Sequence, residues 1–250
     1  MDTHLQTAAR AVAKAARLVV FTGAGVSKES GIPTFREPEV GLWAKYDPME
    51  LATPEAYLRE PLLVWTWYEH RFGTTASAEP NPGHVAIAEL EKLRPRVSVI
   101  TQNIDGLHQR AGSSDVIELH GSMNRFKCIH GRHTGFTFDD FAGQERKPPR
   151  CPHCGDLLRP EVVWFGEALP PDAIGRAQQL SAACDVMLVV GTSGVVYPAA
   201  AMPLIAKEAG AVVIDVNPEK DALAARADIF LKGPGGEVLP DLVAAVRERG

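Results

Sequence analysis

Five short apolar runs recur along the chain, and each is bounded by polar residues or glycine. They are Leu18–Phe21, Val97–Thr101, Val116–Leu119, Val186–Val190 and Val212–Val216. Their apolarity is continuous rather than alternating, which is typical of strands that helices cover on both faces. Helical patterns such as His84–Leu93 and Pro198–Ala209 lie between them. The pattern predicts an α/β fold built on a doubly wound, Rossmann-like parallel sheet.

Two stretches interrupt this rhythm. Residues 37–82 are rich in Trp, Tyr and Pro and contain no convincing buried strand, so we expect a helical insertion. Residues 122–167 contain three of the four cysteines and several histidines, which favours a small zinc-binding module. The segments that remain, 1–36, 83–121 and 168–250, make up the predicted Rossmann-like domain.

Composition narrows the class of protein. Of 250 residues, 45% are hydrophobic and 23% are charged, which is the balance of a soluble globular protein. The net charge of −5 argues against a nucleic-acid partner, because phosphate contacts need a concentrated basic surface. The apolar runs are too short to cross a membrane, and residues 1–16 lack the apolar core of a secretion signal. We therefore expect a cytoplasmic protein without a membrane partner.

The segment after the first apolar run carries Gly23 and Gly25, followed by Gly31. A buried strand that runs into a glycine turn is typical of a dinucleotide site, where we expect backbone amides to lie free to meet a phosphate. The spacing differs from the G-x-G-x-x-G of hydride-transfer enzymes, and no acidic residue ends a second strand about 20 residues later. The segment therefore indicates a dinucleotide but disfavours a dehydrogenase.

Polar motifs follow the other predicted strands. They are Thr101–His108, Glu118–Ser122, Gly191–Ser193 and Asn217–Glu219. The carboxyl ends of parallel strands meet at one edge of the sheet, so we expect these motifs to line the same crevice as the glycine turn.

Each motif also has a simpler interpretation. Asn103 and Asp105 could cap a helix that starts near Asp105. A lone His120 is more often structural, although a histidine pKa near neutrality suits proton abstraction. The gathering of several polar motifs on one rim favours binding and catalysis over these alternatives.

Five motifs in order along the chain carry a resemblance to a known family. They are GAGVSKESGIPTFR, TQNIDGLH, ELHGS, VVWFGE and GTS. The chain resembles the sirtuins, which are NAD-dependent protein-lysine deacylases. The resemblance implies that NAD is consumed as a co-substrate, that the partners are acyl-lysine proteins or peptides, and that the products are free lysine, nicotinamide and O-acyl-ADP-ribose.

The resemblance also implies roles for individual residues. His120 would be the general base, with Asn103 beside it as a second catalytic residue. The implied NAD contacts are Gly23, Ala24, Gly25, Ser30, Gly31, Ile32, Thr34, Phe35, Arg36, Trp43, Gln102, Asn103, Ile104, Asp105, Gly191, Thr192, Ser193, Asn217, Pro218, Glu219 and Gly235. The implied contacts to the acyl-lysine substrate are Tyr68, Arg71, Val163, Phe165, Gly166, Glu167 and Val195.

Tyr68 and Arg71 stand three residues apart and share one face of a predicted helix. An amphipathic helix with an exposed arginine would show the same spacing. The pair resembles the Tyr-x-x-Arg of sirtuins that remove malonyl, succinyl and glutaryl groups, and an arginine fork can grip a carboxylate with two bonds. A general acetyl-lysine deacetylase, a mono-ADP-ribosyltransferase and an inactive zinc-bearing binding module remain alternatives.

The zinc module departs from the family pattern. Cys151 and Cys154 form a C-x-x-C turn with Cys128 upstream, but position 131, where the family usually has a fourth cysteine, is glycine. A structural zinc needs four ligands, so either a histidine substitutes or the site is incomplete or empty. The Cys-x4-His spacing favours His133 over His130, which would tend to point away from Cys128 in an extended chain. We expect one structural zinc ion held by Cys128, His133, Cys151 and Cys154.

Overall fold

The computed structural model describes residues 3–34, 43, 45–220 and 223–249. Within these residues, six parallel strands form the main sheet in the order β3-β2-β1-β6-β7-β8. The strands are β1 (Arg17–Thr22), β2 (Arg96–Thr101), β3 (Val116–Glu118), β6 (Val186–Val190), β7 (Val212–Asn217) and β8 (Ile229–Lys232). All five predicted strands are confirmed. The sequence patterns missed β8, a four-residue edge strand that is mostly half-exposed.

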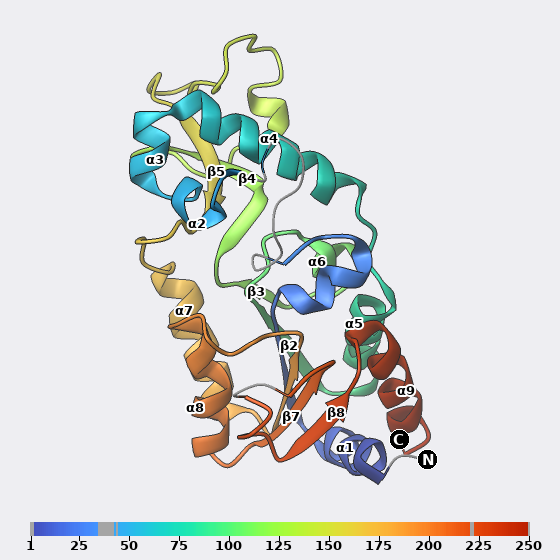
Figure 1. The fold of residues 1–250 in the computed structure, drawn as a ribbon. Helices are drawn as coiled ribbons and strands as arrows, with labels where there is room; N and C mark the ends of the chain where they lie inside the picture. Colours follow the sequence, from blue (N-terminus) through green and yellow to red (C-terminus); the bar gives the residue numbers. More distant parts are fainter. Residues whose placement is uncertain (1–2, 35–42, 44, 221–222, 250) are drawn as a thin grey trace.

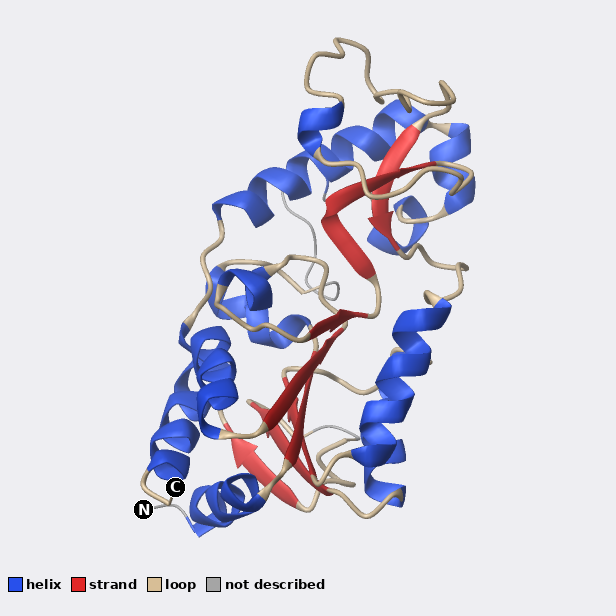
Figure 2. Cartoon of the chain, turned by 180° about the vertical axis from the view of Figure 1, so that it is seen from behind, coloured by secondary structure: helices blue, strands red, loops and turns tan. Residues whose placement is uncertain are grey.

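Helices cover both faces of this sheet, as Figures 1 and 2 show. Leu18 and Val20 of β1 join one buried cluster, which packs under α1 (Thr3–Lys14), α5 (Pro82–Leu93) and α9 (Gly235–Arg247). Val19 and Phe21 join another, which packs under α7 (Pro171–Ala183) and α8 (Met202–Glu208). Alternate residues of a strand point to opposite faces, so a strand that is apolar throughout needs this double cover.

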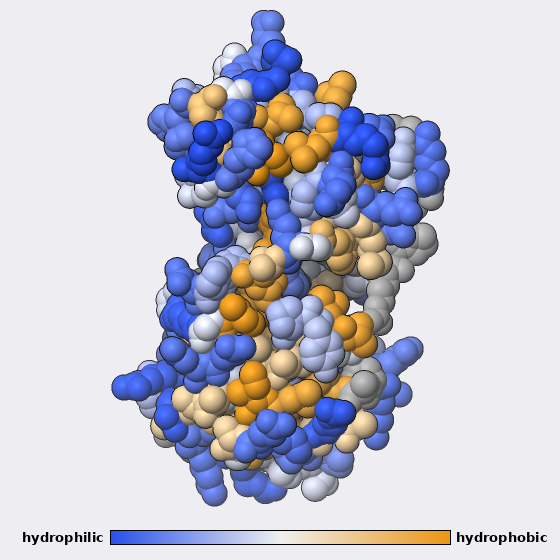
Figure 3. All heavy atoms as spheres, turned by 90° about the vertical axis from the view of Figure 1, so that its left-hand side faces the viewer, coloured by the Kyte–Doolittle hydropathy of each residue, from blue (hydrophilic) through white to orange (hydrophobic). Residues whose placement is uncertain are grey.

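A second, separate core lies above the sheet in Figure 1. It is formed by α2 (Pro48–Leu51), α3 (Pro54–Arg59), α4 (Pro61–Ser77) and the antiparallel pair β4 (Gly121–Cys128) and β5 (Leu158–Val162). Aromatic side chains dominate this core, including Trp65 and Phe126, whose ring centroids lie 5.9 Å apart. In the space-filling view the molecule narrows between the two parts, and apolar residues are exposed around this waist (Figure 3).

Four short helical segments complete the description: η1 (Ala24–Ser30), α6 (Leu107–Arg110), η3 (Phe138–Asp140) and η4 (Ala199–Ala201). The first two follow β1 and β2 directly and so lie at the carboxyl edge of the sheet. None of the helices in the described ranges is long and apolar enough to span a bilayer.

The order of the strands reverses between β1 and β6, which is the switch point where α/β folds bind ligands. The turns after these two strands touch by their backbones. The Gly25 N–H donates to the Gly191 carbonyl over 2.8 Å, and a Cβ on Gly25 would lie 2.7 Å from the Gly191 Cα. Gly191 itself has φ of +60°, which favours glycine. The glycines therefore allow two loops to meet where a side chain would hold them apart.

We predict that Gly25→Ala lowers the free energy of unfolding by about 2 kcal/mol, because the added methyl group meets backbone that cannot move aside. Gly73→Ala is the matched control, since Gly73 lies in α4 with nothing within 4 Å of an added Cβ. It should be neutral or stabilising by up to about 1 kcal/mol. Urea denaturation of both variants measures this, and equal stability of the two would contradict the close contact.

Candidate active site and metal site

Polar side chains from three strands meet at the carboxyl edge of the sheet. Gln102, which follows β2, donates from Nε2 to the Thr192 hydroxyl over 2.9 Å. Asn217, at the end of β7, donates from Nδ2 to the Thr192 carbonyl over 3.1 Å. The structure therefore brings together residues far apart in the sequence, as the shared rim of a parallel sheet requires.

The glycine turn differs from the expectation of free amides. Gly23 donates its N–H to the Val190 carbonyl over 3.1 Å, and Gly25 donates to Gly191. The expectation is wrong for these two groups, because the neighbouring β6 turn is close enough to accept both bonds. Asn103 holds the same turn from the other side, donating from Nδ2 to the Gly23 carbonyl over 3.2 Å and to Ser27 Oγ over 3.0 Å.

A buried polar network lies behind the turn. Ser27 donates to Asp105 Oδ2 over 2.8 Å, while Asp105 Oδ1 accepts the Leu107 N–H over 2.9 Å. Asp105 therefore caps α6, as the simpler interpretation held, and also joins the rim. His84 Nε2 lies 3.4 Å from Ser27 Oγ.

Sequence reasoning missed the parts that Ser27 and His84 play in this network. Ser27 lies inside the glycine motif, which was its only signal. His84 lies three residues after the helix cap Asn81 and looked like an ordinary helical residue.

Two histidines in this region are buried and neutral. Burial lowers the pKa of His84 to about 4, although the nearby Asp105 opposes the shift. Burial, together with the neighbouring His84, lowers the pKa of His108 to about 3. Their rings lie 5.0 Å apart edge to face, and His108 Nε2 is 2.9 Å from the Thr22 hydroxyl. Asp105 is then the only charged group in this network among the described residues.

His120 stands just past β3, with its ring fixed by one hydrogen bond. Its Nδ1 lies 2.8 Å from the Gln102 carbonyl oxygen. Because a carbonyl can only accept, Nδ1 carries the proton and Nε2 keeps its lone pair. Burial lowers the pKa of His120 below its usual range, although the Gln102 bond opposes this. The imidazole is therefore neutral at pH 7 and has a basic nitrogen available.

The predicted substrate segment begins beside this histidine. Val163 donates its N–H to the His120 carbonyl over 2.9 Å, and Phe165 donates to the Ala52 carbonyl over 2.9 Å. Phe165 is 40% exposed, and Val195, which follows β6, is 54% exposed. Gly166 is exposed with φ of +87°.

Glu167, the last residue of that segment, is held by the protein itself. Its carboxylate accepts bonds of 2.6 and 2.9 Å from the guanidinium of Arg159, which is only 1% exposed. Burial opposes ionisation, but the bonds from Arg159 hold the pKa of Glu167 below its usual range. The neighbouring Arg159 therefore already engages the carboxylate that was expected to contact substrate.

Tyr68 and Arg71 both lie on α4, over the second core. Tyr68 is 3% exposed, and its hydroxyl oxygen accepts the Trp164 indole N–H over 2.8 Å. Arg71 is half-buried, with its guanidinium carbon 5.0 Å from the Trp67 ring centroid. Burial raises the pKa of Tyr68 to about 12, and the nearby charge of Arg71 opposes the shift.

The remaining predicted NAD contacts fall in three places. Ser30 accepts a bond of 3.0 Å from Asn81, and Gly235 packs against Val190 at the start of α9. Trp43 is buried in the aromatic core, with its ring centroid 6.4 Å from His70. Near the rim, Ala24 begins η1, and Ile32 and Thr34 follow it. Ile104 packs on the second core, and Ser193, Pro218 and Glu219 follow β6 and β7. Phe35 and Arg36 lie outside the described residues.

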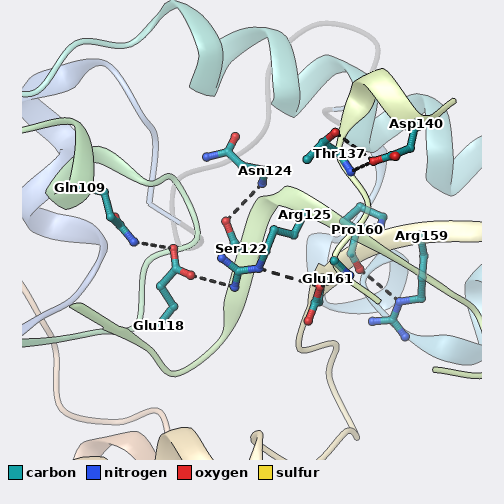
Figure 4. A network of polar contacts seen from close by, with 11 residues as sticks. Gln109, Glu118, Ser122, Asn124, Arg125, Thr137, Asp140, Arg159, Pro160 and Glu161 are labelled. Carbon is teal, nitrogen blue, oxygen red and sulfur yellow. Dashed lines mark hydrogen bonds and ion pairs between the residues drawn. The ribbon is translucent and has the colours of Figure 1, made fainter. Parts of the chain in front are cut away.

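A line of polar contacts joins the end of β3 to β4 and β5 of the second core (Figure 4). Gln109 donates to Glu118 Oε1 over 3.0 Å, and Arg125 of β4 pairs with Glu118 Oε2 at 2.9 Å. Arg125 also lies 3.9 Å from the Glu161 carboxylate of β5. Glu118 is two residues before His120. The Glu118–Arg125 ion pair therefore anchors the end of β3 to the second core, which carries the predicted substrate segment.

Cys128, His133, Cys151 and Cys154 form the candidate metal site, with their ligand atoms all within 4.8 Å of one another. His133 Nδ1 lies 3.6 Å from Cys151 Sγ and 4.0 Å from Cys128 Sγ. Tetrahedral zinc with these donors would separate them by roughly 3.5 to 3.8 Å, so the His133–Cys151 pair already fits and the wider pairs would close slightly around a structural zinc ion. His130 is not part of this group among the described residues.

Comparison with known proteins places the chain in a family. The Sir2 family matches residues 23–198. An NAD-dependent protein deacylase 2 from Pyrobaculum aerophilum is 56% identical over 238 residues, which cover 95% of this chain and 94% of that protein.

Solved structures agree with this match. A Sir2 homologue in complex with NAD is 47% identical, covers 99% of this chain and 94% of its own, and superposes with a TM-score of 0.91. Sir2Af2 bound to a myristoylated histone peptide is 39% identical, with a TM-score of 0.79 and 99% and 98% of the two chains covered. The chain belongs to the Sir2 family, the sirtuins.

We predict that His133→Ala loses the metal whereas His130→Ala keeps it. Removing one of four ligands opens the tetrahedral site, and the structure places only His133 among the three cysteines. Metal analysis of protein purified in zinc-containing medium measures the ratio of zinc to chain. A wild-type value below about half an ion per chain, or loss of zinc from the His130 variant alone, would contradict this ligand set.

Proposed function

We propose that this protein removes succinyl and malonyl groups, and glutaryl groups as well, from lysine side chains of proteins or peptides, and that it removes acetyl groups only weakly. The broader activity follows from its family: the chain is an NAD-dependent protein deacylase and uses NAD as a co-substrate. The observation that carries the narrower proposal is the placement of Tyr68 and Arg71 together on α4, close enough that the charge of Arg71 acts on the Tyr68 hydroxyl.

The rim of the sheet suits a dinucleotide. The glycines at positions 25 and 191 let the two turns pack together at the rim, and Thr192 and Asn217 offer hydroxyl and amide groups suited to a ribose. Asn103 Nδ2 donates hydrogen bonds to the Gly23 carbonyl and to Ser27 Oγ. Its Oδ1 accepts no bond from a described residue, so we assign it to orienting a hydroxyl or water near the reacting groups.

His120 is the proposed general base. NAD supplies the ribose carbon that receives the acyl oxygen when nicotinamide leaves. The protein positions that carbon and accepts the proton that a ribose hydroxyl group gives up. The Nε2 lone pair of His120 does so while Nδ1–H stays on the Gln102 carbonyl. The bond from Val163 to the His120 carbonyl keeps the proposed substrate segment at this histidine.

Val163, Phe165, Gly166 and Val195 are proposed to hold the acyl-lysine chain from two sides, by addition of an extended strand. In that mode main-chain bonds give affinity, so we expect little dependence on target sequence. Glu167 has a supporting role in this scheme, because Arg159 already occupies its carboxylate.

The acidic preference rests on the residues of this chain. One solved relative holds a myristoylated histone peptide, whose acyl chain has no charge. Arginine can hold a carboxylate with two parallel bonds, and a tyrosine hydroxyl adds a third. We also propose a cytoplasmic location. In support, the four cysteines are free, as in a reducing compartment, and three of them lie at the candidate metal site.

We predict that the pH profile of kcat/KM falls on its acid side with an apparent pKa below 6.5. His120 is neutral above its own pKa, and burial lowers that pKa from the usual value of 6.5. Activity should therefore persist at pH 6.5 and decline only at more acidic pH. His120→Ala should cost roughly 10² to 10⁴ in kcat. An acid limb centred above pH 7 in the wild type would contradict a neutral, buried base.

We predict that Arg71→Met lowers kcat/KM for a succinyl-lysine peptide by roughly 30-fold, equivalent to about 2 kcal/mol, because it leaves a carboxylate without its charged partner. Activity on the acetyl peptide should change little. Arg59→Met is the matched control, since Arg59 is exposed at the end of α3 and pairs with the adjacent Glu60. Mass spectrometry of the reaction with NAD would detect O-succinyl-ADP-ribose. Equal loss on both peptides would overturn the acidic preference.

A further inference from the structure

The geometry points to Trp164 as a specificity-determining residue that orients the hydroxyl group of Tyr68. We propose that the indole N–H donates a hydrogen bond to the Tyr68 oxygen and so occupies it as an acceptor. The Tyr68 hydroxyl can then only donate to the acyl group. A site arranged in this way favours a carboxylate over the isosteric carboxamide. The inference rests on the proposed deacylation of acidic acyl-lysines and identifies what sets its selectivity.

The first step is the direction of one hydrogen bond. An indole nitrogen can only donate, so the 2.8 Å contact between Trp164 Nε1 and the Tyr68 oxygen makes that oxygen the acceptor. The Tyr68 proton must point elsewhere. Among the described residues no acceptor receives it, although the side chain is only 3% exposed. A buried donor without a partner costs free energy until a ligand accepts its bond.

The second step is the rigidity of the indole. The backbone N–H of Trp164 donates to Glu167 Oε2 over 2.8 Å, and the guanidinium carbon of Arg159 lies 3.2 Å from the ring centroid. Arg159 in turn holds Glu167 by two bonds. On another side, the Tyr57 ring packs 5.2 Å from the indole. These contacts fix the ring plane and with it the direction of Nε1–H.

The third step is the match to the ligand. A carboxylate offers only acceptors, which suits a Tyr68 that can only donate and an Arg71 that carries a positive charge. A carboxamide also brings an NH2 group, which needs an acceptor. The indole already occupies the Tyr68 oxygen on that side, and Glu167 is occupied by Arg159. Trp164 therefore disfavours the amide without touching the acyl group.

The test compares three peptides that carry acetyl-lysine, succinyl-lysine or succinamyl-lysine, the last ending in a carboxamide. Trp164→Phe keeps an aromatic ring but removes the N–H. We expect it to raise KM for the succinyl peptide about tenfold with kcat nearly unchanged. Parameters for the acetyl peptide should stay the same. The preference for succinyl over succinamyl should shrink by a similar factor, because Tyr68 becomes free to accept a bond.

Trp65→Phe is the matched control. Trp65 is equally buried on the same helix as Tyr68, but its indole nitrogen has no partner among the described residues. It should leave all three KM values unchanged. In a Tyr68→Phe background, Trp164→Phe should have no further effect on the preference, since the two residues act through one bond.

The outcomes separate the two proposals. A wild-type enzyme that prefers acetyl over succinyl peptides overturns the proposed function. A wild-type enzyme that prefers succinyl, combined with a Trp164→Phe variant that keeps full discrimination against succinamyl, overturns the inference about Trp164 alone. Equal losses on all three peptides also overturn it. If Trp164→Phe does not fold, Tyr68→Phe provides the test, because retained carboxylate preference in that variant contradicts a donating Tyr68.

Discussion

The site depends on the backbone contact between the turns after β1 and β6. Their meeting at the switch point of the sheet requires glycine at positions 25 and 191, because a Cβ at either position would overlap the other turn. Hydrogen bonds hold Asn103, Gln102 and Thr192 around this contact. The contact lies at the switch point of the sheet, where α/β folds bind their ligands.

Burial controls the charge state of the histidines near that contact. His84, His108 and His120 all have a pKa lowered by desolvation, so they remain neutral while Asp105 stays the single charge of its network within the described residues. A neutral His120 with its proton fixed on Nδ1 can take up another proton, whereas an exposed imidazole would be partly protonated near neutral pH. The burial of Arg159 likewise strengthens its ion pair with Glu167.

Two of the contacts that couple the Rossmann-like sheet to the aromatic core above it lie at His120. Arg125 reaches from β4 to Glu118 at the end of β3, and Val163 bonds to the His120 backbone. Both contacts lie within two residues of His120, so the proposed base and the proposed substrate segment are positioned by the same short piece of chain. On α4, Tyr68 contacts the same segment through Trp164.

The sequence by itself determined the parts of the protein that follow from periodicity and motif. Continuous apolar runs predicted the buried strands, and the ordered motifs identified the sirtuins and the residues of the rim. The Cys-x4-His spacing selected His133, which the structure places among the three cysteines. These features are local in the chain, so they can be read without knowing which segments meet.

Only the tertiary structure decided which groups are already engaged. It showed that the Gly23 and Gly25 amides bond to the β6 turn, that Arg159 holds Glu167, and that Ser27 and His84 join Asp105. It also placed Trp164 against Tyr68, although 96 positions separate them in the chain. Hydrogen-bond direction and burial depend on contacts between distant segments, and neither leaves a periodic signal in the sequence.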